Sequence, residues 1–150
     1  MKYTTQGVLE TEEIGRHLAE KLDTGKVSSA FIALFGEMGV GKTAFTRGFA
    51  SYFGIGTVKS PTYTVVNEYR GKRSIFHFDM YRIDGEDDLY SIGFDDYIER
   101  EGYAIAEWSE RIVDFLPRHT IRVTISRTPD DTEKRIIEID TGKAYDHISI

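Results

Sequence analysis

The sequence contains no cysteine, which excludes disulfide bonds and metal sites built from thiolates. Any metal ion must therefore be bound by oxygen or imidazole ligands. Proline is scarce, with three residues at positions 61, 117 and 129, and no Pro/Gly/Ser-rich stretch divides the chain. We therefore expect residues 1–150 to form a single domain, since one hydrophobic core usually serves a chain of this size.

Long apolar runs and runs of basic residues are also missing. The longest apolar run, Ala30 to Phe35, is far too short to cross a bilayer. The N-terminus lacks the basic-then-apolar pattern of a signal peptide, so we expect a cytoplasmic protein without membrane contacts. The net charge of -6 opposes direct binding to a polyanion, and we expect another protein to hold any nucleic acid involved.

The first third of the sequence predicts a helix, a strand and a second helix. Thr11 to Leu22 repeats apolar side chains at helical spacing, and Thr11 is placed to cap that helix. Ser29 to Phe35 is almost entirely apolar, which is typical of a strand buried on both faces of a parallel sheet. A helical stripe of four aromatic residues follows, ended by Gly54. The stripe consists of Phe45, Phe49, Tyr52 and Phe53.

The remainder of the sequence is richer in strand patterns. Tyr63 to Tyr69 and Ser74 to Asp79 flank a turn and predict an antiparallel hairpin. Leu89, Ile92 and Ile98 indicate a short, broken helical region. Tyr103 to Ala106 predicts a second buried strand, and Glu107 follows at its carboxyl end. We expect the C-terminal third to be antiparallel, because its alternating segments flank a turn. These segments are Ile121 to Ser126, the turn Pro129-Asp130-Asp131, and Arg135 to Ile139.

The segment Gly36-Glu37-Met38-Gly39-Val40-Gly41-Lys42-Thr43 satisfies the phosphate-loop pattern G-x-x-x-x-G-K-[ST] between a predicted strand and a predicted helix. Glycines let successive backbone N–H groups face a phosphate, and the helix N-terminus adds partial positive charge. Lys42 would contact the β- and γ-phosphates, and the Thr43 hydroxyl would bind Mg²⁺. We therefore expect ATP and Mg²⁺ as ligands, rather than a solvated glycine-rich turn, in a three-layer α/β, P-loop NTPase-like fold with a parallel core and antiparallel hairpins.

Four further residues have a functional and a structural interpretation. Asp79 and Glu107 each follow a strand and could be the acid beside the metal, or solvated turn residues. Thr62, in Ser60-Pro61-Thr62-Tyr63-Thr64, could sense the γ-phosphate, or belong to a proline turn. His77 could act as a base or simply be packed and hydrogen-bonded. A fifth, Trp108, could be core, an aromatic platform or a partner contact.

Four segments together closely resemble the bacterial TsaE (YjeE) family in type, order and spacing: the glycine loop, Ser60 to Thr64, His77-Phe78-Asp79-Met80-Tyr81-Arg82, and Glu107-Trp108. The resemblance implies an ATPase that supports threonylcarbamoyladenosine modification of tRNA at position 37 with the partners TsaB and TsaD. It further implies that the loop binds ATP, that Thr43 and Glu107 hold Mg²⁺, that Asp79 is a Walker B-like acid, and that Trp108 lies next to the nucleotide.

Three other functions share the glycine loop. A small-molecule kinase would need an acceptor pocket and an arginine-bearing lid, which the sequence does not suggest. A GTPase would carry an N-K-x-D element, and none is present. A nucleotide-dependent assembly switch, in which hydrolysis is incidental, remains compatible with the sequence. The residues that contact adenine are not identified by any of these patterns.

Overall fold

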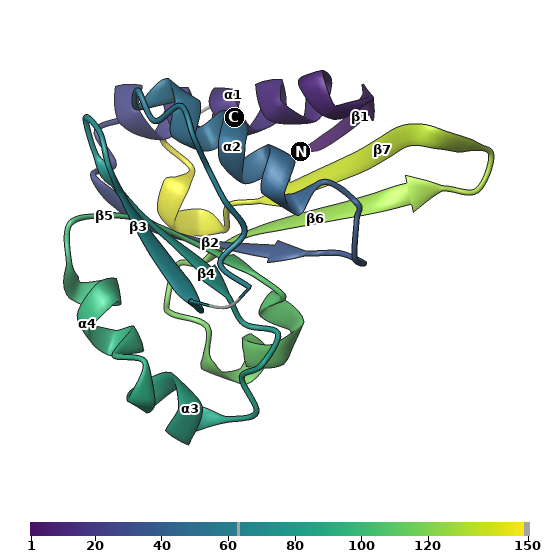
Figure 1. The fold of residues 1–150 in the computed structure, drawn as a ribbon. Coiled ribbons are helices and arrows are strands. Elements are labelled where there is room, and N and C mark those ends of the chain that lie inside the picture. Colours follow the sequence, from purple (N-terminus) through teal and green to yellow (C-terminus); the bar gives the residue numbers. More distant parts are fainter. Residues whose placement is uncertain (63, 149–150) are drawn as a thin grey trace.

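A computed structural model describes residues 1–62 and 64–148. Within these ranges seven strands form one mixed sheet in the order β1-β7-β6-β2-β5-β4-β3 (Figure 1). The strands are β1 (Lys2–Gln6), β2 (Ser29–Phe35), β3 (Val66–Arg70), β4 (Ser74–Asp79), β5 (Gly102–Glu107), β6 (Ile121–Thr128) and β7 (Asp131–Asp140).

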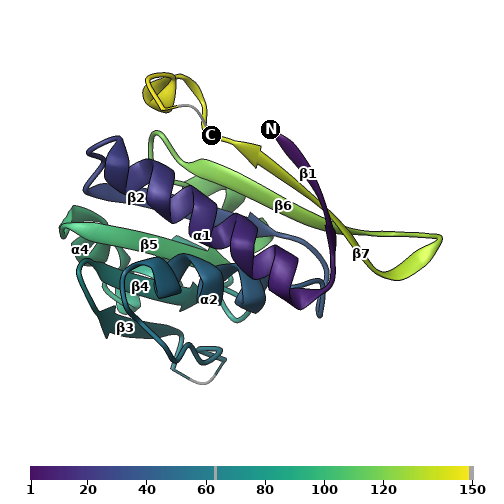
Figure 2. The ribbon, with the colours of Figure 1, turned by 90° about the horizontal axis from the view of Figure 1, so that it is seen from above.

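Helices cover both faces of the sheet and give the molecule three layers. α1 and α2 lie side by side on one face, and α3, α4 and η1 lie on the other (Figures 1 and 2). The helices are α1 (Val8–Thr24), α2 (Lys42–Tyr52), α3 (Glu86–Ser91), α4 (Phe94–Glu99), and the 3₁₀ helices η1 (Ser109–Phe115) and η2 (Lys143–Tyr145). Among the described residues, no helix combines the length and apolar character needed to span a membrane.

The centre of the sheet is parallel and its margins are antiparallel. β2 pairs in parallel with both β5 and β6, and β4 pairs in parallel with β5. β3 is added to β4 as an antiparallel hairpin, while β7 joins β6 and then β1 in antiparallel fashion. The α/β fold, the parallel core and the antiparallel hairpins expected from the sequence are confirmed.

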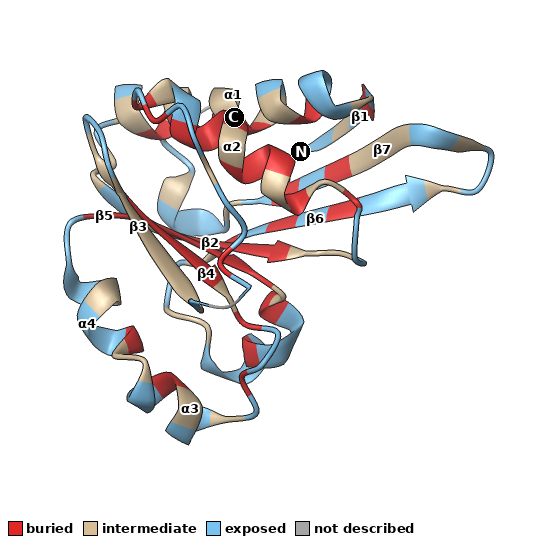
Figure 3. Ribbon diagram, in the orientation of Figure 1, coloured by how far each residue is buried: buried red, intermediate tan, exposed pale blue. Residues whose placement is uncertain are grey.

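The two faces of the sheet have separate cores. One core packs α1 and α2 against residues such as Ile32, Ile105 and Val123, and the other packs α3, α4 and η1 against residues such as Phe76 and Phe78. Burial is therefore concentrated in the central strands and in the inner side of α2 (Figure 3). This explains why β2 and β5 have nearly unbroken apolar sequences, since both of their faces are covered.

Three expectations from the sequence require correction. α1 begins one turn earlier than predicted, with Gly7 at its N-cap, and Thr11 lies buried inside the helix with its Oγ1 3.1 Å from Thr5 Oγ1. β1, which was not predicted, forces this early start because Gly7, at φ 94°, connects the strand directly to the helix. β6 is antiparallel only to β7, because its other neighbour, β2, runs parallel to it. The predicted hairpin start, Tyr63, lies outside the described residues, and β3 begins at Val66.

The contact between α1 and α2 depends on two glycines. A Cβ on Gly15 would lie 2.1 Å from the Phe45 carbonyl oxygen, and a Cβ on Gly48 would lie 1.8 Å from the Glu12 carbonyl oxygen. Because each glycine has no side chain, the backbone of the opposite helix can pack directly against it. This close approach fixes α2, and with it the loop that precedes α2, above the sheet.

We expect Gly48→Ala to destabilise the protein, although the same change in an open helix stabilises it by up to about 1 kcal/mol. The added methyl meets rigid backbone, and such overpacking costs about 1–3 kcal/mol. Urea unfolding measures the loss. Gly85→Ala is the matched control, since Gly85 has extended backbone and no atom within 4 Å of an added Cβ. An unchanged unfolding midpoint for Gly48→Ala would contradict the tight helix contact.

Candidate functional site

The Gly36–Thr43 loop turns directly from β2 into α2. Gly36, Gly39 and Gly41 have φ angles of 147°, 78° and 116°, which residues with side chains rarely adopt. A Cβ on Gly36 would also lie 2.5 Å from the Ile125 carbonyl oxygen. The first glycine is therefore required for the loop to pack against β6, and the loop reaches the N-terminus of α2 with its backbone in a conformation suited to anions.

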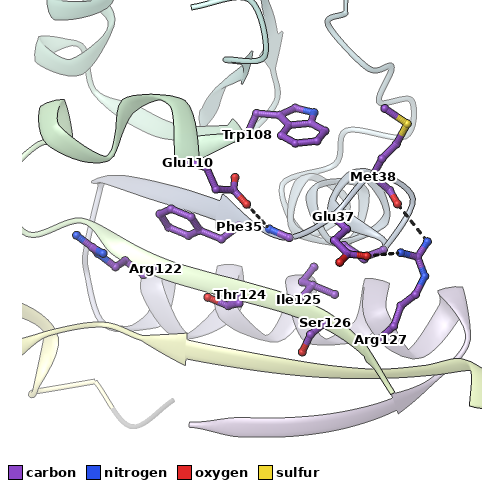
Figure 4. A pocket seen from close by; sticks show the side chains of 12 residues that line it. Phe35, Glu37, Met38, Trp108, Glu110, Arg122, Thr124, Ile125, Ser126 and Arg127 are labelled. Atoms are coloured by element: carbon purple, nitrogen blue, oxygen red, sulfur yellow. Dashed lines mark hydrogen bonds and ion pairs between the residues drawn. The ribbon is translucent and has the colours of Figure 1, made fainter. Parts of the chain in front are cut away.

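Side chains from the C-terminal hairpin hold the loop in place. Arg127 Nη1 lies 3.3 Å from Glu37 Oε2, and its Nη2 donates to the Met38 carbonyl at 3.1 Å (Figure 4). Arg135 Nε donates to the Val40 carbonyl at 2.9 Å. These contacts tie the outer part of the loop to β6 and its centre to β7.

η1 holds the opposite end of the loop. Glu110 Oε2 accepts a hydrogen bond from Gly36 N–H at 2.9 Å (Figure 4). The loop is thus attached to both the hairpin and the segment that follows β5. Arg127, Arg135 and Glu110 were not singled out in the sequence, because charged residues in a turn or an alternating strand look the same whether they are solvated or engaged.

Lys42 is buried at the first position of α2, with 5% of its surface exposed. Its Nζ donates to the Gly36 carbonyl at 2.7 Å and lies 3.9 Å from the centre of the Trp108 ring. Burial lowers the pKa of the Lys42 ammonium, while Glu110, Glu107 and Asp79 oppose this shift. The ammonium is therefore fixed beneath the loop by one carbonyl and one aromatic face, in a setting that favours a further anionic partner.

The carboxyl ends of β4 and β5 bring the predicted acids to the same point. Asp79 and Glu107 are direct partners in the parallel register. Thr43 Oγ1, from the first turn of α2, donates to the Glu107 carboxylate with distances of 3.2 and 3.3 Å to its two oxygens. A hydroxyl and a carboxylate oxygen are ligands that Mg²⁺ prefers, and Mg²⁺ keeps several waters in such sites, so these two residues fit the ion.

His77 forms a buried contact with the Glu107 carboxylate. It is fully buried, and its Nε2 lies 2.5 Å from Glu107 Oε2. Its Nδ1 has no hydrogen-bond partner within residues 1–62 and 64–148. Of the two interpretations drawn from the sequence, the packed and hydrogen-bonded one describes this histidine, and its contact restricts the orientation of the glutamate.

The remaining predicted residues have different surroundings. Asp79 Oδ1 accepts a hydrogen bond from Tyr81 N–H at 2.9 Å. Trp108 is half-buried, adopts a left-handed backbone at φ 58°, and contacts the edge of Tyr81 as well as Lys42. Thr62 is exposed, and its hydroxyl pairs with Ser60 Oγ at 2.8 Å. Among the contacts of the described residues, none joins Thr62 to the loop.

The chain is similar to known proteins in family, sequence and structure. The family model described as threonylcarbamoyl adenosine biosynthesis protein TsaE matches residues 5–137. The TsaE protein of Bacillus subtilis is 35% identical over 97% of this chain and 89% of its own length. The TsaE protein of Haemophilus influenzae is 40% identical over 77% of this chain and 75% of its own length.

A solved structure is also similar to this chain. The crystal structure of Bacillus subtilis YdiB superposes with a TM-score of 0.78 at 29% identity, and covers 98% of this chain and 89% of that one. Fold and loop therefore define an α/β protein whose mixed sheet carries a glycine loop at its centre. The chain belongs to the TsaE family.

We expect His77→Phe to destabilise the protein by about 1–3 kcal/mol, because an aromatic ring is kept but the buried Glu107 carboxylate loses its contact with His77 and retains, among the described residues, only the hydrogen bond from Thr43. Urea unfolding measures the difference. His147→Phe is the control, since His147 is exposed. A variant as stable as the parent would mean that the short His77–Glu107 contact makes no net contribution to folding.

Proposed function

We propose that this protein binds ATP with Mg²⁺ in the Gly36–Thr43 loop and hydrolyses it in support of the threonylcarbamoyladenosine modification of tRNA at position 37. The observation that carries the proposal is the position of Lys42, which is buried, donates to the Gly36 carbonyl of the loop and interacts electrostatically with Glu107, the partner of Thr43. The family membership and the names of the relatives support the biosynthetic role.

The loop would bind the β- and γ-phosphates. Its glycine backbone, the N-terminus of α2 and the Lys42 ammonium would all present positive charge or N–H donors to the same oxygens. Trp108 would remain next to the phosphates through its contact with Lys42. Because Lys42 is already held by Gly36, little side-chain entropy is lost when a phosphate binds.

Thr43 and Glu107 would hold Mg²⁺, which supplies charge neutralisation for the phosphates when bound. His77 would keep the Glu107 carboxylate oriented toward Thr43. Asp79, the neighbour of Glu107 in the sheet, would act as the Walker B-like acid. The Tyr81 backbone N–H donates to Asp79 Oδ1 and so restricts the Asp79 carboxylate. We assign to this carboxylate the orientation of the water that attacks the γ-phosphate.

The partners would be TsaB and TsaD, in the cytoplasm, with tRNA reached through their complex. The net charge of -6 supports this indirect route, since a tRNA phosphate backbone would be repelled by the isolated chain. The exposed Thr62 and the half-buried Trp108 lie on segments that could meet a partner and respond to nucleotide. Tyr63, in the same segment as Thr62, lies outside the described residues.

We expect Lys42→Ala to lose ATP binding by about tenfold or more while its circular dichroism stays unchanged, because the lysine is a ligand group. Calorimetry and phosphate release, measured alone and with TsaB and TsaD, provide the test. Lys72→Ala, in the exposed β3–β4 turn, is the control.

Hydrolysis stimulated by the partners agrees with the proposal. ATP-dependent assembly without turnover would favour the switch, and transfer to a small acceptor would favour a kinase.

We expect Glu107→Ala to weaken ATP binding in the presence of Mg²⁺ by about tenfold, and to have much less effect in excess chelator. The reason is that Glu107 would contact the nucleotide only through the ion. Titration of ATP into the parent and the variant, each with and without Mg²⁺, measures both differences. An equal loss under both conditions would make Glu107 a structural residue of the site.

A further inference from the structure

Four side chains form a continuous stack that leads from the phosphate loop to the surface. The Lys42 ammonium lies 3.9 Å from the centre of the Trp108 ring. The Trp108 ring meets the Tyr81 ring at an interplanar angle of 61°, with 5.1 Å between the ring centres. The Arg111 guanidinium lies 5.2 Å from the centre of the Tyr81 ring. The buried lysine of the loop is therefore connected through one indole ring to two exposed side chains.

We propose that Tyr81 is a positioning residue for phosphate binding, whose ring holds Trp108 against the Lys42 ammonium. The inference rests on the proposed function and adds a residue that acts through its neighbours rather than by touching the nucleotide. It places the support for the loop lysine on the segment that follows β4, outside the loop itself.

Trp108 adopts a backbone conformation that requires support. Its φ and ψ angles of 58° and 40° lie in the left-handed region, which is strained for a bulky side chain. Strain of this kind persists only where the surroundings fix the residue, and it is concentrated at functional sites. The indole is half-buried at the margin of one core, so the core covers only part of it. The Tyr81 ring packs against the indole and supplies a further contact.

The backbone of Tyr81 is well placed to give this support. The preceding residue, Met80, is fully buried, and its N–H donates to the Glu107 carbonyl at 3.0 Å. The Tyr81 N–H donates to Asp79 Oδ1 at 2.9 Å. The backbone at Tyr81 is therefore fixed relative to both acids of the site, and its ring can hold Trp108 in a constant position.

The stack restricts the ammonium group that would meet the phosphates. Lys42 Nζ donates to the Gly36 carbonyl and also lies against the Trp108 ring, which leaves its remaining N–H donors few directions. Without the Tyr81 ring, the Trp108 side chain gains rotational freedom and holds the ammonium less firmly. Lys42 then has more freedom to lose when a phosphate binds, so the affinity for phosphates falls.

The test compares Tyr81→Leu, which removes the ring, with Tyr81→Phe, which keeps it. Both are titrated by calorimetry with ATP and with inorganic tripolyphosphate, each with Mg²⁺. We expect Tyr81→Leu to lose about fivefold in affinity for both ligands, because the effect acts on the phosphates. Tyr81→Phe should bind both within about twofold of the parent. Tyr90→Leu is the matched control, since Tyr90 is 86% exposed on α3, and it should bind as the parent does.

Trp108 is the only tryptophan in the sequence, so its fluorescence reports on the stack without any nucleotide. We expect the emission of Tyr81→Leu to shift to longer wavelength, and to be quenched more readily by acrylamide, than that of the parent, Tyr81→Phe or Tyr90→Leu. In a Trp108→Leu background, Tyr81→Leu should reduce ATP affinity by no more than about twofold, since two changes that act through the same contact are not additive.

Four results would each overturn the inference: unchanged ATP affinity in Tyr81→Leu, an unchanged emission spectrum, equal losses in Tyr81→Leu and Tyr81→Phe, or losses that multiply in the double variant. A loss for ATP without a loss for tripolyphosphate would also contradict it, because Tyr81 would then act on the nucleoside. A parent that binds neither ligand would instead refute the proposed function, and the inference would fall with it.

Discussion

The close approach of the Gly36–Thr43 loop to β6 is the constraint on which the site depends. Only a residue without a side chain fits between the end of β2 and the Ile125 carbonyl. The carbonyl of the same residue, Gly36, accepts the hydrogen bond from Lys42 Nζ. A larger residue would therefore displace the loop from the sheet and the lysine from beneath the loop, so packing and charge placement are fixed by one contact.

The second element of the site follows from the parallel register of β4 and β5. Because the carboxyl ends of these strands coincide, Asp79 and Glu107 lie side by side. His77, two residues before Asp79 on β4, contacts the Glu107 carboxylate. α2 begins above this point and contributes Thr43. Polar side chains from three separate segments of the sequence meet because strand ends in a parallel sheet share one edge.

Much of this arrangement could be predicted from the sequence. The apolar run Ser29 to Phe35, the glycine loop and the aromatic stripe of α2 are local patterns, and each has the structure that it indicated. β1 was missed because its mixed polar sequence is stabilised by pairing with β7, more than 120 residues away, rather than by its own pattern. The start of α1 was misplaced for the same reason, since Gly7 follows that strand.

The C-terminal hairpin shows most clearly where prediction from sequence ends. Arg127 and Arg135 donate to the carbonyls of Met38 and Val40, and a backbone carbonyl is present at every position of any loop. No residue in the loop could therefore signal which arginine would be its partner. Only the register of β6 beside β2, set by a crossover through η1, brings these guanidinium groups to the loop. A segment with a generic strand pattern thus determines the position of the most specific motif in the chain.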